Sequence, residues 1–173
     1  MDLVDLINRT RFLGPEFLTW LWYRVEVQQG VFDVGGELGP FELWFDDRLV
    51  VGSATLGAQE NHFKGGHPAS SAEARTALRI GKLANQARLR IVRASAEWSF
   101  VLKDDLSVAG VKIPAVLGRE DEEQLDERML LLDQLDAMVK GLLAQFLALR
   151  VSPEWTTDEL PALLAWVRTD GAA

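Results

Sequence analysis

The sequence predicts one α+β domain over residues 1–173, with an antiparallel sheet, helices packed on one face of it and a long C-terminal helix. Three observations predict this class. Segments near both ends carry apolar residues at spacings of three and four, which is typical of helices with one buried stripe. Segments in the middle alternate apolar and polar residues, with turn-forming residues between them. A chain of 173 residues, 48% of them hydrophobic, is long enough to bury one core.

The first expected helix begins at Gly14-Pro15, because proline suits the first helical position, where its missing N–H is not needed. It continues to Val25. Its buried stripe is predicted to contain Phe17, Leu18, Leu21, Trp22 and Val25.

Two short strands are expected next, over 41–45 and 48–51. Asp46-Asp47 lies between them, and because Asp favours turns, we interpret the segment as a hairpin. Residues 58–70 hold both histidines, Gly65-Gly66 and a proline with few apolar residues, which predicts an exposed loop.

The centre of the chain predicts a helix followed by three antiparallel strands. Ser70 or Ser71 can cap the helix, which is expected to run to about Ala84. Alternation then predicts strands over 86–92 and 97–103, and the turn at Asp104-Asp105 leads into a third strand over 106–113.

A long helix is expected from Leu125 to Leu149, and Pro153 ends it. At 1.5 Å per residue it is about 37 Å long, more than the width of so small a core. We therefore expect part of it to meet another chain, most simply in a homo-oligomer. Thr157 and Asp158 begin a short final helix. The stripe of the long helix contains Leu125, Met129, Leu132, Leu135, Val139, Leu142, Phe146 and Leu149.

The composition excludes several classes of protein. The absence of cysteine excludes disulfides, thiolate nucleophiles and cysteine-ligated metal sites. Residues 1–10 include Asp2, Asp5 and Arg9, so they lack the pattern of a signal peptide. No apolar run reaches the roughly 20 residues of a membrane span. We expect a cytoplasmic protein without a membrane partner.

Candidate catalytic and metal-binding groups are sparse. His62 and His67 lack a standard ligand spacing. The aspartate pairs fit turns better than acid–base or Mg²⁺ chemistry, since adjacent strand residues point to opposite faces. No serine or glycine motif matches a nucleophile elbow, a phosphate loop or a dinucleotide fingerprint. We predict no enzyme activity, no catalytic residue, no metal and no cofactor.

Positive charge is concentrated in one segment of an acidic chain. The formal net charge is -8, yet residues 71–93 carry +5. If the helix and the strand in this segment lie side by side, their cations converge on one strip that is free to neutralise phosphates without base contacts. The cations of this strip are Arg75, Arg79, Lys82, Arg88 and Arg90.

A second interpretation treats these cations as solvated or paired with acids elsewhere. Residues 120–136 hold eight carboxylates, which suit either pairing with the cations or a surface for docking a protein partner. Of the six tryptophans, Trp20 and Trp44 remain candidates for stacking on unpaired bases, whereas the others fit a core better.

Five segments resemble the C-terminal half of the RdgC recombination-associated proteins. The resemblance extends over nearly the whole chain, which is about half of the family's usual length. They are GPEFLTWLWYR, FELWFDDRLVV, SSAEARTALRIGKLANQARLRI, EWSFVLKDDLSVAGVKI and ERMLLLDQLDAMVKGLLAQFL. The resemblance implies a bacterial, nucleoid-associated protein that binds double-stranded DNA with little sequence preference, forms a ring-shaped dimer and limits the access of RecA.

Two lysines match positions of the family's motif. Lys82 corresponds to the lysine of the family's helix, and Lys112 lies where the family has a basic cluster after the hairpin. Residues 108–111 are Val-Ala-Gly-Val here, where the family has further cations. The resemblance thus adds Lys112 to the predicted DNA-binding residues.

The leading hypothesis is a non-enzymatic, sequence-nonspecific DNA-binding protein that acts as a homo-oligomer in the nucleoid. The alternative is an interaction or scaffold subunit whose acidic surface docks a protein partner and which does not bind DNA. The DNA hypothesis requires that the cationic groups are not already neutralised within the fold.

Overall fold

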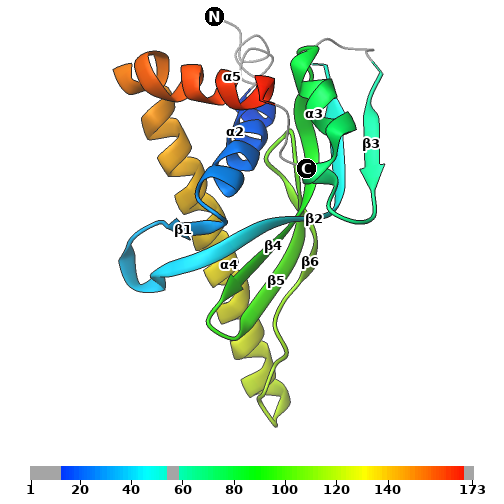
Figure 1. Ribbon diagram of the computed structural model, residues 1–173. Helices are drawn as coiled ribbons and strands as arrows, with labels where there is room; N and C mark the ends of the chain where they lie inside the picture. The colour runs from blue at the N-terminus through cyan, green and yellow to red at the C-terminus, as the bar shows by residue number, and fades with distance from the viewer. Residues whose placement is uncertain (1–12, 54–58, 170–173) are drawn as a thin grey trace, which may run out of the picture.

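The structure, a computed structural model, describes residues 13–53 and 59–169, which form one six-stranded antiparallel sheet and four α-helices (Figure 1). The predicted α+β class is therefore confirmed. The expectations for residues 1–10, and for Ala58 at the start of the predicted loop, lie outside the described residues.

The four helices lie in the predicted segments. Helix α2 covers Leu13–Val27, α3 covers Ala72–Arg79, α4 covers Asp121–Arg150 and α5 covers Leu160–Arg168. Helix α4 thus begins at Asp121, before the predicted Leu125, and α5 begins at Leu160, after the predicted Thr157. Ser71 caps α3, because its Oγ accepts a hydrogen bond from the Ala74 N–H at 3.1 Å. The prediction that this helix continues to Ala84 is wrong. Gly81 takes a left-handed φ of 86°, which ends the helix and turns the chain into the next strand.

Strand β2 pairs with three other strands and replaces the predicted hairpin. It runs without a turn over Pro40–Gly52 and pairs with β1 (Val31–Asp33), β3 (Asn61–Lys64) and β4 (Leu83–Arg93). Asp46 and Asp47 form a bulge instead, because the register shifts between Phe45 and Leu49. The predicted loop is likewise interrupted by β3, which pairs with the second half of β2.

Strands β4, β5 (Ala96–Lys103) and β6 (Val108–Lys112) form the three consecutive antiparallel strands that the alternation predicts. The turn at Asp104-Asp105 is also present, with the Leu106 N–H donating to the Lys103 carbonyl at 2.9 Å. Helix α2 begins against this turn. A Cβ on Gly14 would overlap the carbonyl oxygen of Asp104, so this approach requires glycine.

The core lies between the sheet and the helices. Leu43, Leu49, Leu89 and Phe100 of the strands are fully buried together with α2 residues. Helix α4 joins this core through its second half, where Phe146 packs against aromatic residues of α2 and of the turn before α5. All four helices thus contribute to a core on one face of the sheet. The α4 residues in this core are Leu135, Met138, Leu142 and Phe146.

The first turns of α4 project beyond the ends of the strands, at the bottom of Figure 1. This confirms that the helix is longer than the core that it covers. Over the described ranges, none of the helices combines the length and the apolar character that a membrane span requires.

Candidate nucleic-acid interface

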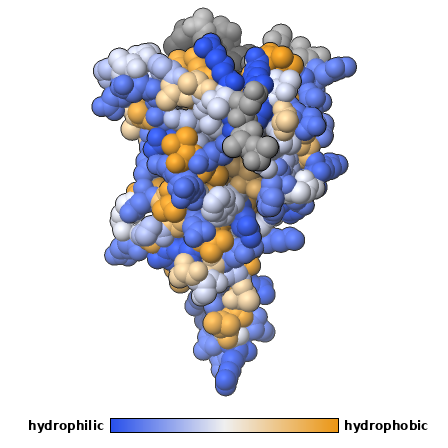
Figure 2. All heavy atoms as spheres, viewed as in Figure 1, coloured by the Kyte–Doolittle hydropathy of each residue, from blue (hydrophilic) through white to orange (hydrophobic). Residues whose placement is uncertain are grey.

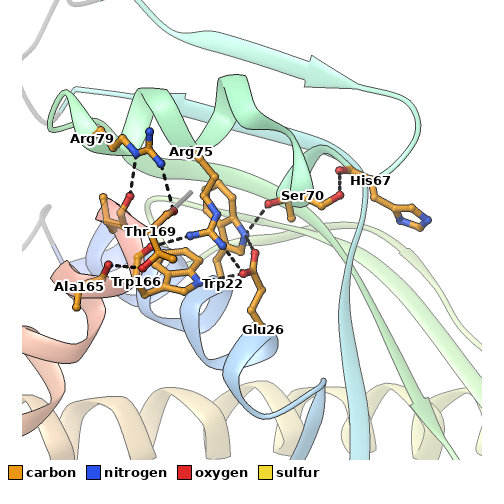
Figure 3. Close-up of polar contacts among 11 residues, drawn as sticks. Trp22, Glu26, His67, Ser70, Arg75, Arg79, Ala165, Trp166 and Thr169 are labelled. Carbon is orange, nitrogen blue, oxygen red and sulfur yellow. Dashed lines mark hydrogen bonds and ion pairs between the residues drawn. The ribbon is translucent and has the colours of Figure 1, made fainter. Parts of the chain in front are cut away.

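Arg75 is neutralised within the fold, contrary to the requirement of the DNA hypothesis. Its side chain points from α3 toward α2 and α5 (Figure 3), and the residue is only 7% exposed. One guanidinium nitrogen donates to the Glu26 carboxylate, and Nη1 donates to the Trp166 carbonyl at 3.0 Å. Burial lowers the pKa of Arg75 and the neighbouring Arg79 adds to this, whereas Glu26 acts in the opposite direction. The assignment of Arg75 to DNA is wrong, because the residue holds three helices together.

Arg79 and Lys82 are also engaged by neighbouring backbone. Arg79 donates to the carbonyls of Val167 and Thr169, at 3.2 and 3.1 Å, and so connects α3 with the end of α5 (Figure 3). Lys82 donates to the carbonyl of Gln59 at 2.9 Å and to the side-chain oxygen of Asn61. Both residues connect segments of the protein, which is a structural role.

The predicted convergence of five cations does not occur. Helix α3 packs on the helical face of the sheet, whereas Arg88 and Arg90 alternate with the buried Ala87 and Leu89 on β4. Because side chains alternate along a strand, the two arginines point to the other face. Helix α3 contacts β2, β3 and α5, and its cations lie on the other side of the sheet from Arg88 and Arg90.

The same alternation identifies three cations that the sequence analysis missed. Leu49 and Leu102 are in the core, so the adjacent Arg48 and Lys103 point to the opposite face, and Lys64 pairs directly with Arg48 across β2 and β3. No sequence motif indicates the pairing of β2 with β3, so the sequence alone does not predict that these residues share a face. We call the resulting surface the cationic face. Its cations are Arg48, Lys64, Arg88, Arg90, Lys103 and Lys112.

Lys112 reaches the cationic face through a row of cross-strand neighbours. Trp44 pairs with Arg90, Arg90 with Ser99, and Ser99 with Lys112, on four adjacent strands. Directly opposite residues share a face of the sheet, so an aromatic ring and two cations lie along one line. Trp44 is half-buried, whereas Trp20 is 3% exposed, which removes Trp20 as a candidate for base stacking.

The arginines of the cationic face are held loosely in comparison with Arg75. Arg88 lies 3.7 Å from Asp47 and Arg90 lies 3.9 Å from Glu97, distances too long for hydrogen bonds. Both Nε atoms are buried without a hydrogen-bond partner among the described residues. Three carboxylates, those of Asp47, Glu97 and Glu42, lie among these cations.

The acidic segment at the start of α4 is used in part by the fold itself. Glu127 accepts hydrogen bonds at 2.9 Å from the N–H groups of Leu117 and Gly118, and Glu123 accepts one from Arg119. Among the described residues, Arg75, Arg88 and Arg90 form ion pairs with Glu26, Asp47 and Glu97, which lie outside this acidic segment. Within residues 13–53 and 59–169, no three His, Asp or Glu side chains gather closely enough to hold a metal ion.

In comparisons with known proteins, neither a family model nor a curated protein matches the chain.

Proposed function

We propose that the protein is a non-enzymatic module that binds double-stranded DNA without sequence preference through the cationic face. One observation carries this proposal. In a chain of net charge -8, six lysines and arginines lie on the face of the sheet opposite the core. Such a surface attracts a polyanion by releasing the counterions condensed on its phosphates, and it needs no contact with bases.

The loose pairing of Arg88 and Arg90 supports this proposal. A guanidinium that is hydrogen-bonded to a carboxylate must break that bond to bind a phosphate. Arg88 and Arg90 lie 3.7 and 3.9 Å from their carboxylates, so neither has such a hydrogen bond to break. The resemblance to the RdgC family leads to the same activity and adds the nucleoid and recombination to the proposal.

The experiment is retention of a short duplex by the full chain over a series of salt concentrations. We expect log affinity to fall linearly with log salt, and Arg90→Glu to weaken binding and reduce the slope. Arg168→Glu is the matched control, because this arginine is exposed on α5, away from the cationic face, and we expect the slope to be retained. A duplex that is not retained even at about 50 mM salt contradicts the proposal. Weaker binding by Arg168→Glu with unchanged binding by Arg90→Glu contradicts the assignment to the cationic face.

A different observation favours a second function, that of an assembly subunit. The projecting turns of α4 expose Leu125, Met129 and Leu132, at 59%, 53% and 40%, on one side of the helix. Figure 2 shows hydrophobic residues between hydrophilic ones down this end of the molecule. We propose that this stripe packs against a second copy of the chain.

Charge at the start of α4 favours an antiparallel pair of copies. The first turn holds Asp121, Glu122 and Glu123, and an antiparallel arrangement keeps the acidic first turns of the two copies apart. Light scattering is expected to give a dimer for the wild type and a monomer for Met129→Glu. A wild-type monomer overturns the pairing.

A further inference from the structure

A cavity of about 580 Å³ opens beside the cationic face, between the end of α2, the middle of β2 and the segment before α3. Its volume is within the range of small-molecule sites. Aromatic and apolar side chains form most of its wall, and polar groups stand among them. The lining residues are Trp22, Val25, Glu26, Gln29, Trp44, Phe45, His67, Ala69, Ser70 and Arg75.

One wall of this cavity is joined by hydrogen bonds. The Glu26 carboxylate accepts hydrogen bonds from Arg75 and from the indole N–H groups of Trp22 and Trp166. Trp22 also donates to the Ala69 carbonyl at 3.1 Å. These bonds fix the aromatic wall, and they occupy Glu26, so the carboxylate does not repel an incoming group as a free anion does.

Two other lining residues carry groups that can form hydrogen bonds with the edge of a heterocycle. Gln29 offers an amide that both donates and accepts, and Ser70 donates its hydroxyl to the His67 carbonyl while its oxygen keeps lone pairs. Gln29 has a φ of 52°, a left-handed conformation in which glycine is favoured. The strained backbone thus holds a polar side chain where the turn alone would select glycine.

Trp44 connects this cavity with the cationic face. It lines the cavity, and it is also the cross-strand neighbour of Arg90. Its ring is supported from behind, since a Cβ on Gly30 would contact three atoms of the indole within 2.8 Å. A strand of nucleic acid that follows the cations therefore passes an aromatic ring at the mouth of an apolar cavity.

We propose that this cavity takes one unpaired nucleobase of the bound DNA, with Trp44 as the stacking surface. The proposal rests on the proposed function and deepens it, because the cations bind the backbone whereas the cavity distinguishes an extruded base from a paired one. A nucleobase fits the two halves of the site, since it has an apolar π-face and an edge of donors and acceptors.

The test compares a fully paired duplex with the same duplex carrying one extruded 2-aminopurine. Stacking on an aromatic side chain predicts that the full-length wild type binds the bulged duplex about five- to 150-fold more tightly. We expect Trp44→Ala to bring this ratio close to one, and Trp44→Phe to keep most of it. Val27→Ala, on α2 outside the cavity, is the control that retains the wild-type ratio.

Two readouts separate this inference from the proposed function. In the wild type, the emission of the extruded 2-aminopurine is expected to fall on binding, and in Trp44→Ala it is expected to change little. Salt-dependent binding of the paired duplex with no preference for the bulge overturns the base site alone. Failure to bind either duplex overturns the base site together with the proposed function.

Discussion

The guanidinium of Arg75 lies over the indole ring of Trp166, with its central carbon 3.9 Å from the ring centroid, and it donates to the carbonyl of the same residue. Arg75 comes from α3 and Trp166 from α5, and Glu26 of α2 completes the contact. This arrangement explains how a charged side chain is 7% exposed without destabilising the core.

Replacing Arg75 is expected to destabilise the protein. Arg75→Met leaves the Glu26 carboxylate without its cation, and we expect the free energy of unfolding to fall by roughly 3 kcal/mol. Arg75→Lys restores little, since an ammonium cannot both form the fork and lie over the ring. Urea denaturation measures the change. Arg128→Met, at an exposed position of α4, is the control and is expected to change stability by under about 0.5 kcal/mol. Equal stabilities for Arg75→Met and the wild type contradict this role.

The chain has a single tyrosine, so a titration followed by phenolate absorbance reports on one residue. Burial raises the pKa of Tyr23 above 10.0, the negative charge of Glu159 raises it further, and Arg24 opposes them. The stabilisation from the protonated phenol is therefore complete below pH 10.0 and is lost as the pH rises through the folded-state pKa. Phenolate absorbance in the folded protein is expected to appear above the usual pH. Glu159→Gln is expected to move it part of the way back, and a titration at the ordinary pKa in the wild type refutes the assignment.

The turn between β4 and β5 contains a residue in an unfavourable conformation. Ala94 has a φ of 53° and is exposed, so its Cβ is strained and makes no contact with the core. Ala94→Gly removes the strain, and the gain exceeds the added entropy of the unfolded chain. We expect about 0.5 kcal/mol of stabilisation in denaturant melts. Ala96→Gly, within the strand β5, is the opposite control and is expected to destabilise.

At Gly14, helix propensity and packing predict opposite changes in the free energy of unfolding. Gly14→Ala in a helix normally adds about 0.5–1 kcal/mol of stability. Here the new Cβ overlaps the carbonyl oxygen of Asp104, so we expect a loss of more than about 1 kcal/mol. Thermal or urea unfolding shows which effect is larger. A stabilised Gly14→Ala protein means that α2 and the β5–β6 turn do not approach as closely as described.

The local elements were predictable because they depend on residues close together in the chain. The stripe of α2, the presence of α4, the three alternating strands and the turn at Asp104-Asp105 all follow from spacing or from turn chemistry. Of the stripe predicted for α4, only Leu135, Leu142 and Phe146 are buried. The errors occur where a distant partner decides. The local sequence at Asp46-Asp47 predicts a turn, but β4 pairs with β2 both before and after these two residues. Strand β3 pairs with the other edge of β2 from Arg48 onward, so β2 continues through a bulge.

The candidate site was predictable only in part. Arg88 and Arg90 were found because alternation on one strand already separates them from the core, and Lys112 was found through the family resemblance. Arg48, Lys64 and Lys103 were missed because they join the same face only through pairing between strands. Arg75 was misassigned because nothing within its own helix reveals Glu26 and Trp166.

The sequence by itself determined the class of fold, the identity of the long helix and the presence of positive charge in an acidic chain. The tertiary structure decided which cations are buried between helices and which lie on the exposed face of the sheet. Periodicity fixes the direction of a side chain relative to its own element, whereas burial and pairing depend on what another element brings to that side. For this reason Arg75 is a structural residue, and Arg90, fifteen positions later, lies on an open face beside Trp44.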